Sequence, residues 1–163
     1  MRVFIGTDHA GLEFKEHLKQ VLAANGYEPV DCGAFEYDAQ DDYPPFCFEV
    51  GERTVTEPGA LGVVIGGSGN GEQIAANKVP GVRAALVWNT STAQLARQHN
   101  DANVVSIGAR QHTDDEATEL VLEFLRTPFS GDERHIRRIA LISEYERERH
   151  RPSGGLPTRT EHP

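Results

Sequence analysis

Short apolar runs alternate along the chain with longer stretches in which apolar residues keep a helical spacing. The first of these stretches carries Phe14, Leu18, Val21 and Leu22. Their i, i+4, i+7, i+8 spacing is typical of an amphipathic helix that buries one face. Gly26 follows closely, as a glycine commonly does at a helix C-terminus. The pattern therefore predicts a helix that ends before Gly26.

The apolar runs themselves predict five strands, at residues 2–6, 29–32, 61–65, 83–88 and 103–107. Further helical stripes lie at residues 92–99, 117–125 (capped by Thr113) and 136–140. Alternating strands and helices predict a parallel sheet with helices on both faces, and near-continuous apolar strands are typical of such a buried sheet. We therefore expect an α/β fold.

Two segments lack these patterns. Residues 38–45 are acidic and proline-rich, which indicates a loop. The residues that follow the last helical stripe lose all periodicity, which predicts a disordered tail. We therefore expect one domain over residues 1–149 and a tail over residues 150–163.

Composition and charge exclude several classes of protein. The 163 residues suit one compact domain, and the formal net charge of −9 argues against a nucleic-acid binder, although a local basic pocket for a small anion remains open. No apolar run approaches the roughly 20 residues of a membrane span, and the first residues turn polar too soon for a signal peptide. Cys32 and Cys47 form no C-x-x-C pair, so buried packing in a reducing cytoplasm is expected.

Open α/β sheets bind ligands beyond the C-terminal ends of their strands. The segments that follow the first, third and fifth strands are residues 7–11, 66–72 and 108–110, and we expect them to meet in one crevice. The middle segment is rich in glycine, which lets backbone N–H groups approach an anion closely. It leads into helix-compatible residues 73–78, which would add a helix N-terminus.

Three well-known loop patterns each fail in this glycine-rich segment. The dinucleotide pattern G-x-G-x-x-G started at Gly67 has Glu72 at its last position, and the P-loop pattern has Glu72 where it requires lysine. The nucleophile elbow G-x-S-x-G fits Gly66 and Ser68 but ends in Asn70. The loop is therefore expected to cradle a developing oxyanion beside a carboxylate, and no nucleotide cofactor is expected.

Glu72 has two interpretations of equal weight. A carboxylate beside N–H donors suits abstraction of a proton alpha to a carbonyl, because the donors stabilise the enediolate that forms. A glutamate in the first turn of a helix is also simply favoured by the helix dipole. The same dipole lowers a carboxylate pKa, so a useful base would need burial to raise it again.

Basic residues later in the chain are candidates for anion contacts. Arg134 and Arg138 are four residues apart, which places both guanidinium groups on one helix face as a phosphate clamp. An exposed charged helix with neighbouring glutamates is the alternative. His99 closes a helical stripe, where an imidazolium gains from the dipole, or else it is a proton donor that opens a sugar ring.

The histidines lack the company that a metal site requires. No H-E-x-x-H pattern or cysteine cluster accompanies His9 or His99, so no metal is expected. The other five histidines are expected at the surface. They are His17, His112, His135, His150 and His162.

Three motifs together resemble the ribose-5-phosphate isomerase type B family. They are residues 7–11 (Thr-Asp-His-Ala-Gly), the glycine loop running into residues 74–78 (Ile-Ala-Ala-Asn-Lys), and residues 99–103 (His-Asn-Asp-Ala-Asn). The resemblance covers roughly residues 1–148, and the motifs occur in order at the expected spacing. The family also includes isomerases of galactose 6-phosphate and allose 6-phosphate.

The resemblance implies a Rossmann-like three-layer αβα sandwich with a central, mainly parallel five-stranded sheet. It implies a homodimer, with sites completed across the subunit interface and with a pairing of dimers left open. The implied reaction interconverts D-ribose 5-phosphate and D-ribulose 5-phosphate through ring opening and an enediolate, in the non-oxidative pentose phosphate pathway. It needs no metal or cofactor, and neither nucleic acid nor membrane as a partner.

The resemblance also assigns roles to residues. Glu72 is the proton acceptor, and His99 is the donor in ring opening, with Asp8 as the alternative that could share or take that role. Asp8 and His9 contact the substrate, with His9 near the phosphate. The anion cradle, with Ser68 in the anion hole, is Gly67, Ser68, Gly69, Asn70 and Gly71. The remaining contacts are Asn100, Arg110, Arg134 and Arg138.

One position departs from the family pattern. Many members place a cysteine base just before the loop, where this chain has Gly66, and neither Cys32 nor Cys47 aligns there. A subgroup associated with actinobacteria instead carries a glutamate where Glu72 stands. The resemblance to that subgroup and the reasoning from the loop itself both point to Glu72.

Two other classes remain as alternatives. A non-catalytic module could hold a nucleotide or a sugar phosphate as a sensor, although both nucleotide patterns fail. A serine hydrolase could use Ser68, although the elbow pattern is broken. The sequence leaves the choice between five- and six-carbon sugar phosphates open.

Overall fold

The computed structural model describes residues 1–149, and the predicted tail at residues 150–163 lies outside the described residues. The described part contains a single five-stranded sheet in the order β2-β1-β3-β5-β4, with every neighbouring pair parallel. The strands are β1 (Arg2–Thr7), β2 (Glu28–Asp31), β3 (Leu61–Gly66), β4 (Ala84–Leu86) and β5 (Val104–Gly108). The predicted parallel sheet is therefore confirmed, with β4 shorter than expected.

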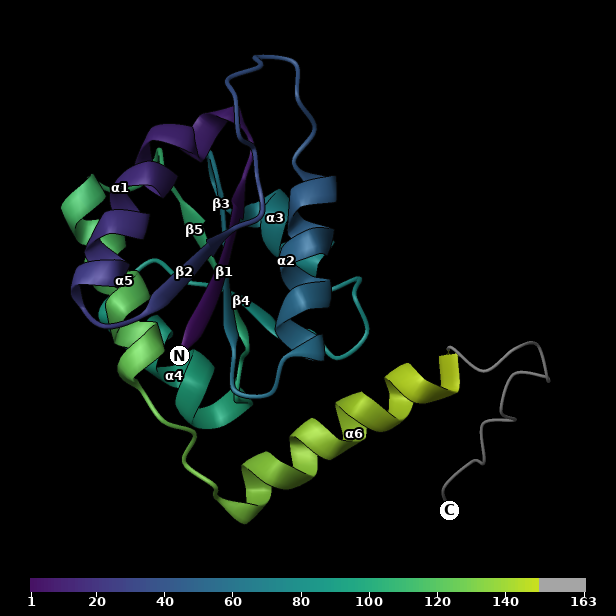
Figure 1. The fold of residues 1–163 in the computed structure, drawn as a ribbon. Coiled ribbons are helices and arrows are strands. Elements are labelled where there is room, and N and C mark those ends of the chain that lie inside the picture. The colour runs from purple at the N-terminus through teal and green to yellow at the C-terminus, as the bar shows by residue number, and fades with distance from the viewer. Residues whose placement is uncertain (150–163) are drawn as a thin grey trace.

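Helices cover both faces of this sheet (Figure 1). One face carries α1 (Leu12–Ala24), α4 (Thr90–Asn100) and α5 (Asp114–Arg126), and the other carries α2 (Pro44–Thr56) and α3 (Asn70–Ala76). Successive residues of a strand point to opposite faces, so Val3 and Ile5 belong to one apolar core and Phe4 to the other. The fold is the expected Rossmann-like three-layer αβα sandwich.

The helix α2 was missed by the sequence analysis, which assigned its start to a loop. Pro44 occupies the first turn, where a missing N–H costs nothing. Cys47, Val50, Gly51 and Thr54 form its buried stripe. Their i, i+3, i+4, i+7 spacing was the available signal, but the polar and proline-rich residues before it concealed the stripe.

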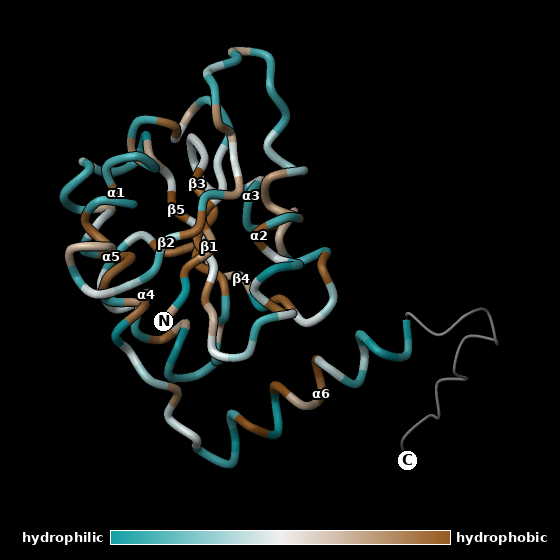
Figure 2. The backbone as a smooth tube through the Cα atoms, viewed as in Figure 1, coloured by the Kyte–Doolittle hydropathy of each residue, from teal (hydrophilic) through white to brown (hydrophobic). Residues whose placement is uncertain are grey.

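The last helix, α6 (Glu133–Arg149), runs along the edge of the molecule and away from the sheet (Figure 1). It touches α4 near its start, and the carboxylate of Glu146 accepts a hydrogen bond from the backbone N–H of Gly81 at 2.8 Å. Figure 2 shows apolar positions along this otherwise hydrophilic helix. Its exposed large apolar side chains are Ile136, Leu141, Ile142 and Tyr145. Among the described helices, none has the length and apolar character that crossing a membrane would require.

Candidate active site

The three segments predicted to converge do meet at the C-terminal edge of the sheet. Thr7 pairs with Ile65, and Gly66 with Gly108, so the ends of β1, β3 and β5 are level. The Thr7 hydroxyl donates to the Ile65 carbonyl at 2.8 Å. The backbone N–H of Arg110 donates to the carbonyl of Gly67 at 3.1 Å. The side chain of Arg110 lies alongside Gly67, which places a cation at the edge of the glycine loop.

The glycine loop is held in a defined shape. Gly69 has a φ of 79°, and a side chain there would meet the backbone of Gly108, so glycine is required on both counts. The hydroxyl of Ser106 donates to the carbonyl of Gly69 at 2.7 Å. The hydroxyl of Ser68 accepts from the backbone and side-chain amides of Asn70. The helix α3 begins at Asn70, earlier than expected, so the loop ends as a helix N-terminus.

Glu72 is buried in the first turn of α3, with 4% of its surface exposed. Burial raises the pKa of its carboxyl group, and the negative charge of Asp8 raises it further. A hydrogen bond from its own backbone N–H acts in the opposite direction and does not prevail. The conflict between helix dipole and base strength is therefore resolved by burial.

Gly66 and Glu72 are sterically linked. A Cβ atom at position 66 would overlap the carboxylate of Glu72. The carboxylate of Glu72 thus occupies the space that a side chain at the end of β3 would take. This explains why a chain with glutamate at position 72 has glycine at position 66.

Tyr43 is a residue of this region that the sequence analysis did not identify. Its ring and hydroxyl group pack against Gly71, where any side chain would clash with them. It lies in the last position before α2, so the error over that helix also concealed this contact. A cleft of about 360 Å³ borders the loop, and Ser68, Trp88 and His112 contribute to its walls.

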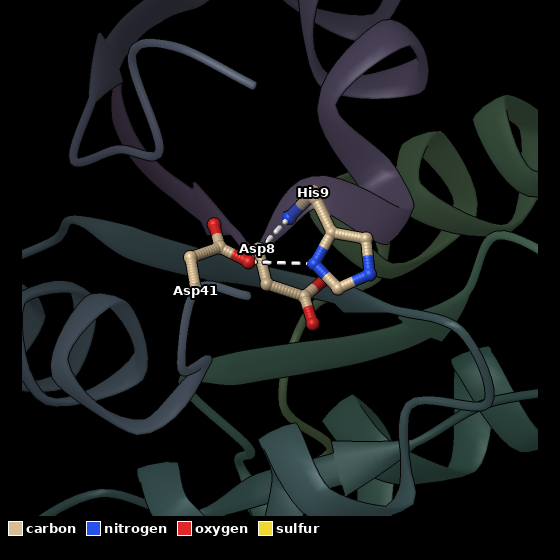
Figure 3. Close-up of side chains that lie close together, drawn as sticks. All are labelled: Asp8, His9 and Asp41. Atoms are coloured by element: carbon tan, nitrogen blue, oxygen red, sulfur yellow. Dashed lines mark hydrogen bonds and ion pairs between the residues drawn. The ribbon is translucent and has the colours of Figure 1, made fainter. Parts of the chain in front are cut away.

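Asp8, His9 and Asp41 form a cluster at the end of β1 (Figure 3). The Nδ1 atom of His9 lies 2.6 Å from the Oδ1 atom of Asp41, and the backbone N–H of His9 donates to the same oxygen at 3.1 Å. Asp8 caps the short turn His9–Gly11 by accepting from the N–H of Ala10 at 3.0 Å. The three side chains offer one nitrogen and two oxygen atoms within 4.8 Å of one another, a set that a divalent cation could use.

The other predicted residues lie at the opposite end of the sheet. The last turn of α4 carries His99 and Asn100 and precedes the start of β5, whereas the glycine loop follows the end of β3. Arg134 and Arg138 are exposed on α6, which begins beside that turn. One chain therefore brings together Asp8, His9, residues 66–72 and Arg110, but it does not bring the other four residues to them.

His135 contradicts the expectation of a surface position. It is 2% exposed, and its ring lies 4.3 Å from that of His99, measured between the ring centroids. Its Nδ1 atom lies 3.0 Å from the hydroxyl of Ser130. Burial and the neighbouring His99 lower the pKa of His135. The reason for the error is that α6 turns this one position toward α4, while its neighbours in the helix face outward.

Both cysteines are free and buried, as expected. Burial raises the pKa of Cys32 to about 11. Burial also raises the pKa of Cys47, and the charges of Glu72 and Asp8 raise it further. Cys47 therefore lies close to the candidate base without the thiolate character of a nucleophile.

The sequence of this chain is similar to that of known isomerases over most of its length. The family model described as Ribose/Galactose Isomerase matches residues 3–142. A ribose-5-phosphate isomerase B from Mycobacterium tuberculosis is 56% identical over 152 residues, which is 93% of this chain and 94% of that protein. The Mycobacterium leprae protein of the same name is 53% identical over the same length, with the same coverage of both chains.

Solved structures agree. Ribose-5-phosphate isomerase B from Mycoplasma genitalium, with bound ribulose-5-phosphate, is 44% identical and superposes with a TM-score of 0.86, covering 90% of this chain and 97% of that one. Type B ribose 5-phosphate isomerase from Trypanosoma cruzi is 43% identical with a TM-score of 0.86, covering 91% and 99%.

Proposed function

This chain belongs to the ribose/galactose isomerase family, and from this premise we propose that it interconverts D-ribose 5-phosphate and D-ribulose 5-phosphate. Relatives of that name are more than half identical over nearly their full length. The observation in the chain itself that carries the proposal is the carboxylate of Glu72, which is buried beside the glycine loop. A base of raised pKa next to a set of N–H donors suits enediolate chemistry.

In the proposed reaction Glu72 takes the proton from C2 of the open-chain aldose. The electron pair of the broken C–H bond forms the C1–C2 double bond, and the aldehyde oxygen becomes an enediolate oxygen. The N–H groups of residues 67–71 stabilise this developing charge. Glu72 then returns the proton to C1, while the hydrogen of the 2-hydroxyl moves to O1, so that C2 becomes the ketone carbon.

The phosphate would be held away from the carbon that reacts. His9 and Arg110 supply one side of this site from the same chain as Glu72, and the exposed guanidinium of Arg110 next to Gly67 supports that role. Arg134 and Arg138 would supply the other side, as two forks on one helix face. Their distance from the loop in one chain supports a second copy as the source of these two arginines.

We further propose that the active protein is a homodimer in which each copy completes the site of the other. His99 and Asn100 would then contact the sugar of the neighbouring site, with His99 or Asp8 as the acid in ring opening. The exposed apolar side chains of α6 support an interface on this helix, because an unpartnered patch of that kind is costly in water. A cytoplasmic location is proposed as well, and the two unpaired cysteines support it.

The first experiment mixes the purified protein with ribose 5-phosphate in the presence of EDTA and follows ribulose 5-phosphate by absorbance. Turnover is expected, and six-carbon aldose phosphates run in parallel test the substrate range. No turnover on any aldose phosphate would contradict the proposal. A thermal-shift panel then separates the sensor alternative, which predicts stabilisation by ATP but none by sugar phosphates.

A further inference from the structure

We propose that Asp41 is a positioning residue that fixes the orientation and the tautomer of His9, so that the Nε2 atom of His9 faces the substrate phosphate. The inference rests on the proposed function, since it deepens the role of His9 in that site. Neither the sequence motifs nor the resemblance to the family pointed to Asp41. It lies in the polar segment between β2 and α2.

The contact between the two side chains is short and partly shielded from water. One oxygen of Asp41, Oδ1, meets both the Nδ1 atom of His9 at 2.6 Å and its backbone N–H at 3.1 Å. Two hydrogen bonds to one oxygen hold the imidazole relative to its own main chain. The side chains are 25% exposed for His9 and 12% for Asp41, so water competes little for the contact.

The chemistry of the pair determines which nitrogen carries the hydrogen. A carboxylate only accepts hydrogen bonds, so Nδ1 of His9 must be the donor. Its Nε2 atom lies on the far side of the ring from Asp41, as Figure 3 shows. It is therefore turned outward, and the imidazolium form presents an N–H donor there to an anion. A carboxylate that orients a ligating histidine in this way is well known in metal sites.

The loop that carries Asp41 is held where it leaves β2 and again by a turn that ends at Asp41. After β2 the backbone of Gly33 and Ala34 pairs with Thr7, at 2.8 and 2.7 Å. The buried ammonium group of Lys15 binds Asp31 and the carbonyl of Ala34. Asp41 itself donates its backbone N–H to the carbonyl of Asp38 at 3.1 Å, which closes a turn. These contacts fix the backbone around Asp41 and thereby hold its carboxylate beside His9.

The second oxygen of Asp41, Oδ2, is buried and has no hydrogen-bond partner among the described residues. A buried acceptor without a donor is costly, and such groups in native proteins commonly have a functional reason. For stability alone an apolar side chain would serve better at this position. A role for Oδ1 in orienting His9 explains why a carboxylate occupies this position despite the cost of the unpaired Oδ2.

The kinetic test compares Asp41→Asn, His9→Asn and the double variant, with Glu36→Gln as the matched control. Glu36 is an exposed carboxylate in the same loop. We expect Asp41→Asn to raise KM for ribose 5-phosphate about tenfold or more, with kcat changed far less, because binding of the phosphate is common to ground state and transition state. The double variant should be no worse than His9→Asn, because Asp41 acts through His9. Additive losses in KM would overturn the proposal.

A second readout does not depend on catalysis. Nitrogen-15 NMR of histidine-labelled protein in EDTA, with the His9 signal identified by its loss in His9→Asn, reports which ring nitrogen carries the hydrogen. The wild type is expected to show the Nδ1–H form at neutral imidazole, and Asp41→Asn a shift toward the Nε2–H form. An Nε2–H form in the wild type would overturn the proposal. If the protein proved inactive on sugar phosphates, this spectrum would still decide the Asp41 contact by itself.

Discussion

At the scale of single residues, Gly66 and Glu72 act as one unit. The carboxylate of Glu72 fills the space above the Cα atom of Gly66, so neither residue type is independent of the other. Burial in that space raises the pKa of Glu72 although it lies in the first turn of a helix. The absence of a side chain at Gly66 therefore explains both where the carboxylate of Glu72 lies and why its pKa is raised.

Replacing Glu72 with glutamine keeps the shape of the side chain and removes the base. We expect kcat for ribose 5-phosphate to fall by about 10²–10⁴-fold, with a smaller change in KM because the N–H donors of the loop remain. The measurement is the continuous assay of ribulose 5-phosphate. Glu13→Gln is the control, since Glu13 is an exposed carboxylate in the first turn of α1. Wild-type turnover in Glu72→Gln would assign the base to another group.

The same substitution should change stability with a definite dependence on pH. The folded protein holds the Glu72 proton above the ordinary pKa of 4.5, where the unfolded chain has lost it. The free energy of unfolding of the wild type therefore falls as the pH rises from 4.5 through the raised pKa of the folded state. Glutamine does not titrate, so the variant Glu72→Gln does not lose this part of its stability. Calorimetry should find a higher Tm for Glu72→Gln than for the wild type at pH 7.5. The difference between the two Tm values should be smaller at pH 4.5. A difference independent of pH would contradict this expectation.

The thiols provide a further test at this scale. Because the pKa values of Cys32 and Cys47 are raised, both thiols stay protonated and unreactive at neutral pH. Treatment of the native enzyme with iodoacetamide should leave turnover unchanged, as measured beside mass spectrometry of the alkylated peptides. Loss of activity in step with alkylation of either cysteine would count against Glu72 as the base.

At the scale of elements, the helices differ in how far local signals specify them. The helix α5 begins with a complete capping box at Thr113 and Glu116, so its start is encoded locally. The helix α6 is different, because its direction depends on contacts far along the chain. The ring of buried His135 packs against that of His99 in α4, tilted by 39°, and the carboxylate of Glu146 accepts a hydrogen bond from the backbone N–H of Gly81.

Replacing His135 with glutamine tests how α6 is docked. The pKa of His135 is lower in the folded protein than its ordinary value of 6.5 in the unfolded chain. The neutral side chain therefore contributes its full share of stability above pH 6.5, and this contribution is lost as the pH falls through the pKa of the folded state. We expect His135→Gln to have a lower free energy of unfolding than the wild type at pH 7.5, and the difference between the two free energies to be smaller at a pH below 6.5. Urea unfolding at both pH values measures this.

At the scale of the whole molecule, the candidate site is divided between two ends of the sheet. The glycine loop lies at the C-terminal edge, whereas His99 and the arginines of α6 lie at the other end. Arg134, Arg138, Leu141 and Tyr145 share one face of α6, because their spacing is i, i+4, i+7, i+11. A second copy that packs on Leu141 and Tyr145 would therefore also contact Arg134 and Arg138, which lie on the same face of the helix.

The double variant Leu141→Glu with Tyr145→Glu should separate the proposed dimer. We expect a monomer in sedimentation velocity, an unchanged circular dichroism spectrum, and a loss in kcat/KM of about 10²-fold or more, because half of the site is then missing. Ala140→Glu is the control, since it adds a charge at an exposed position on a different face of α6. A fully active monomer would rule out a site shared between copies.

The sequence by itself determined the class of fold, and it predicted the edge of the sheet where the candidate site lies and the carboxylate proposed as its base. These follow from local periodicity, from glycine positions and from the rule that parallel strands present their C-terminal ends together. Only the tertiary structure decided the basicity of Glu72, the partnership of Asp41 with His9, the contact of Tyr43 with Gly71, and the burial of His135. Each depends on which side chains come close from distant parts of the chain, and burial and hydrogen bonding then set their chemistry.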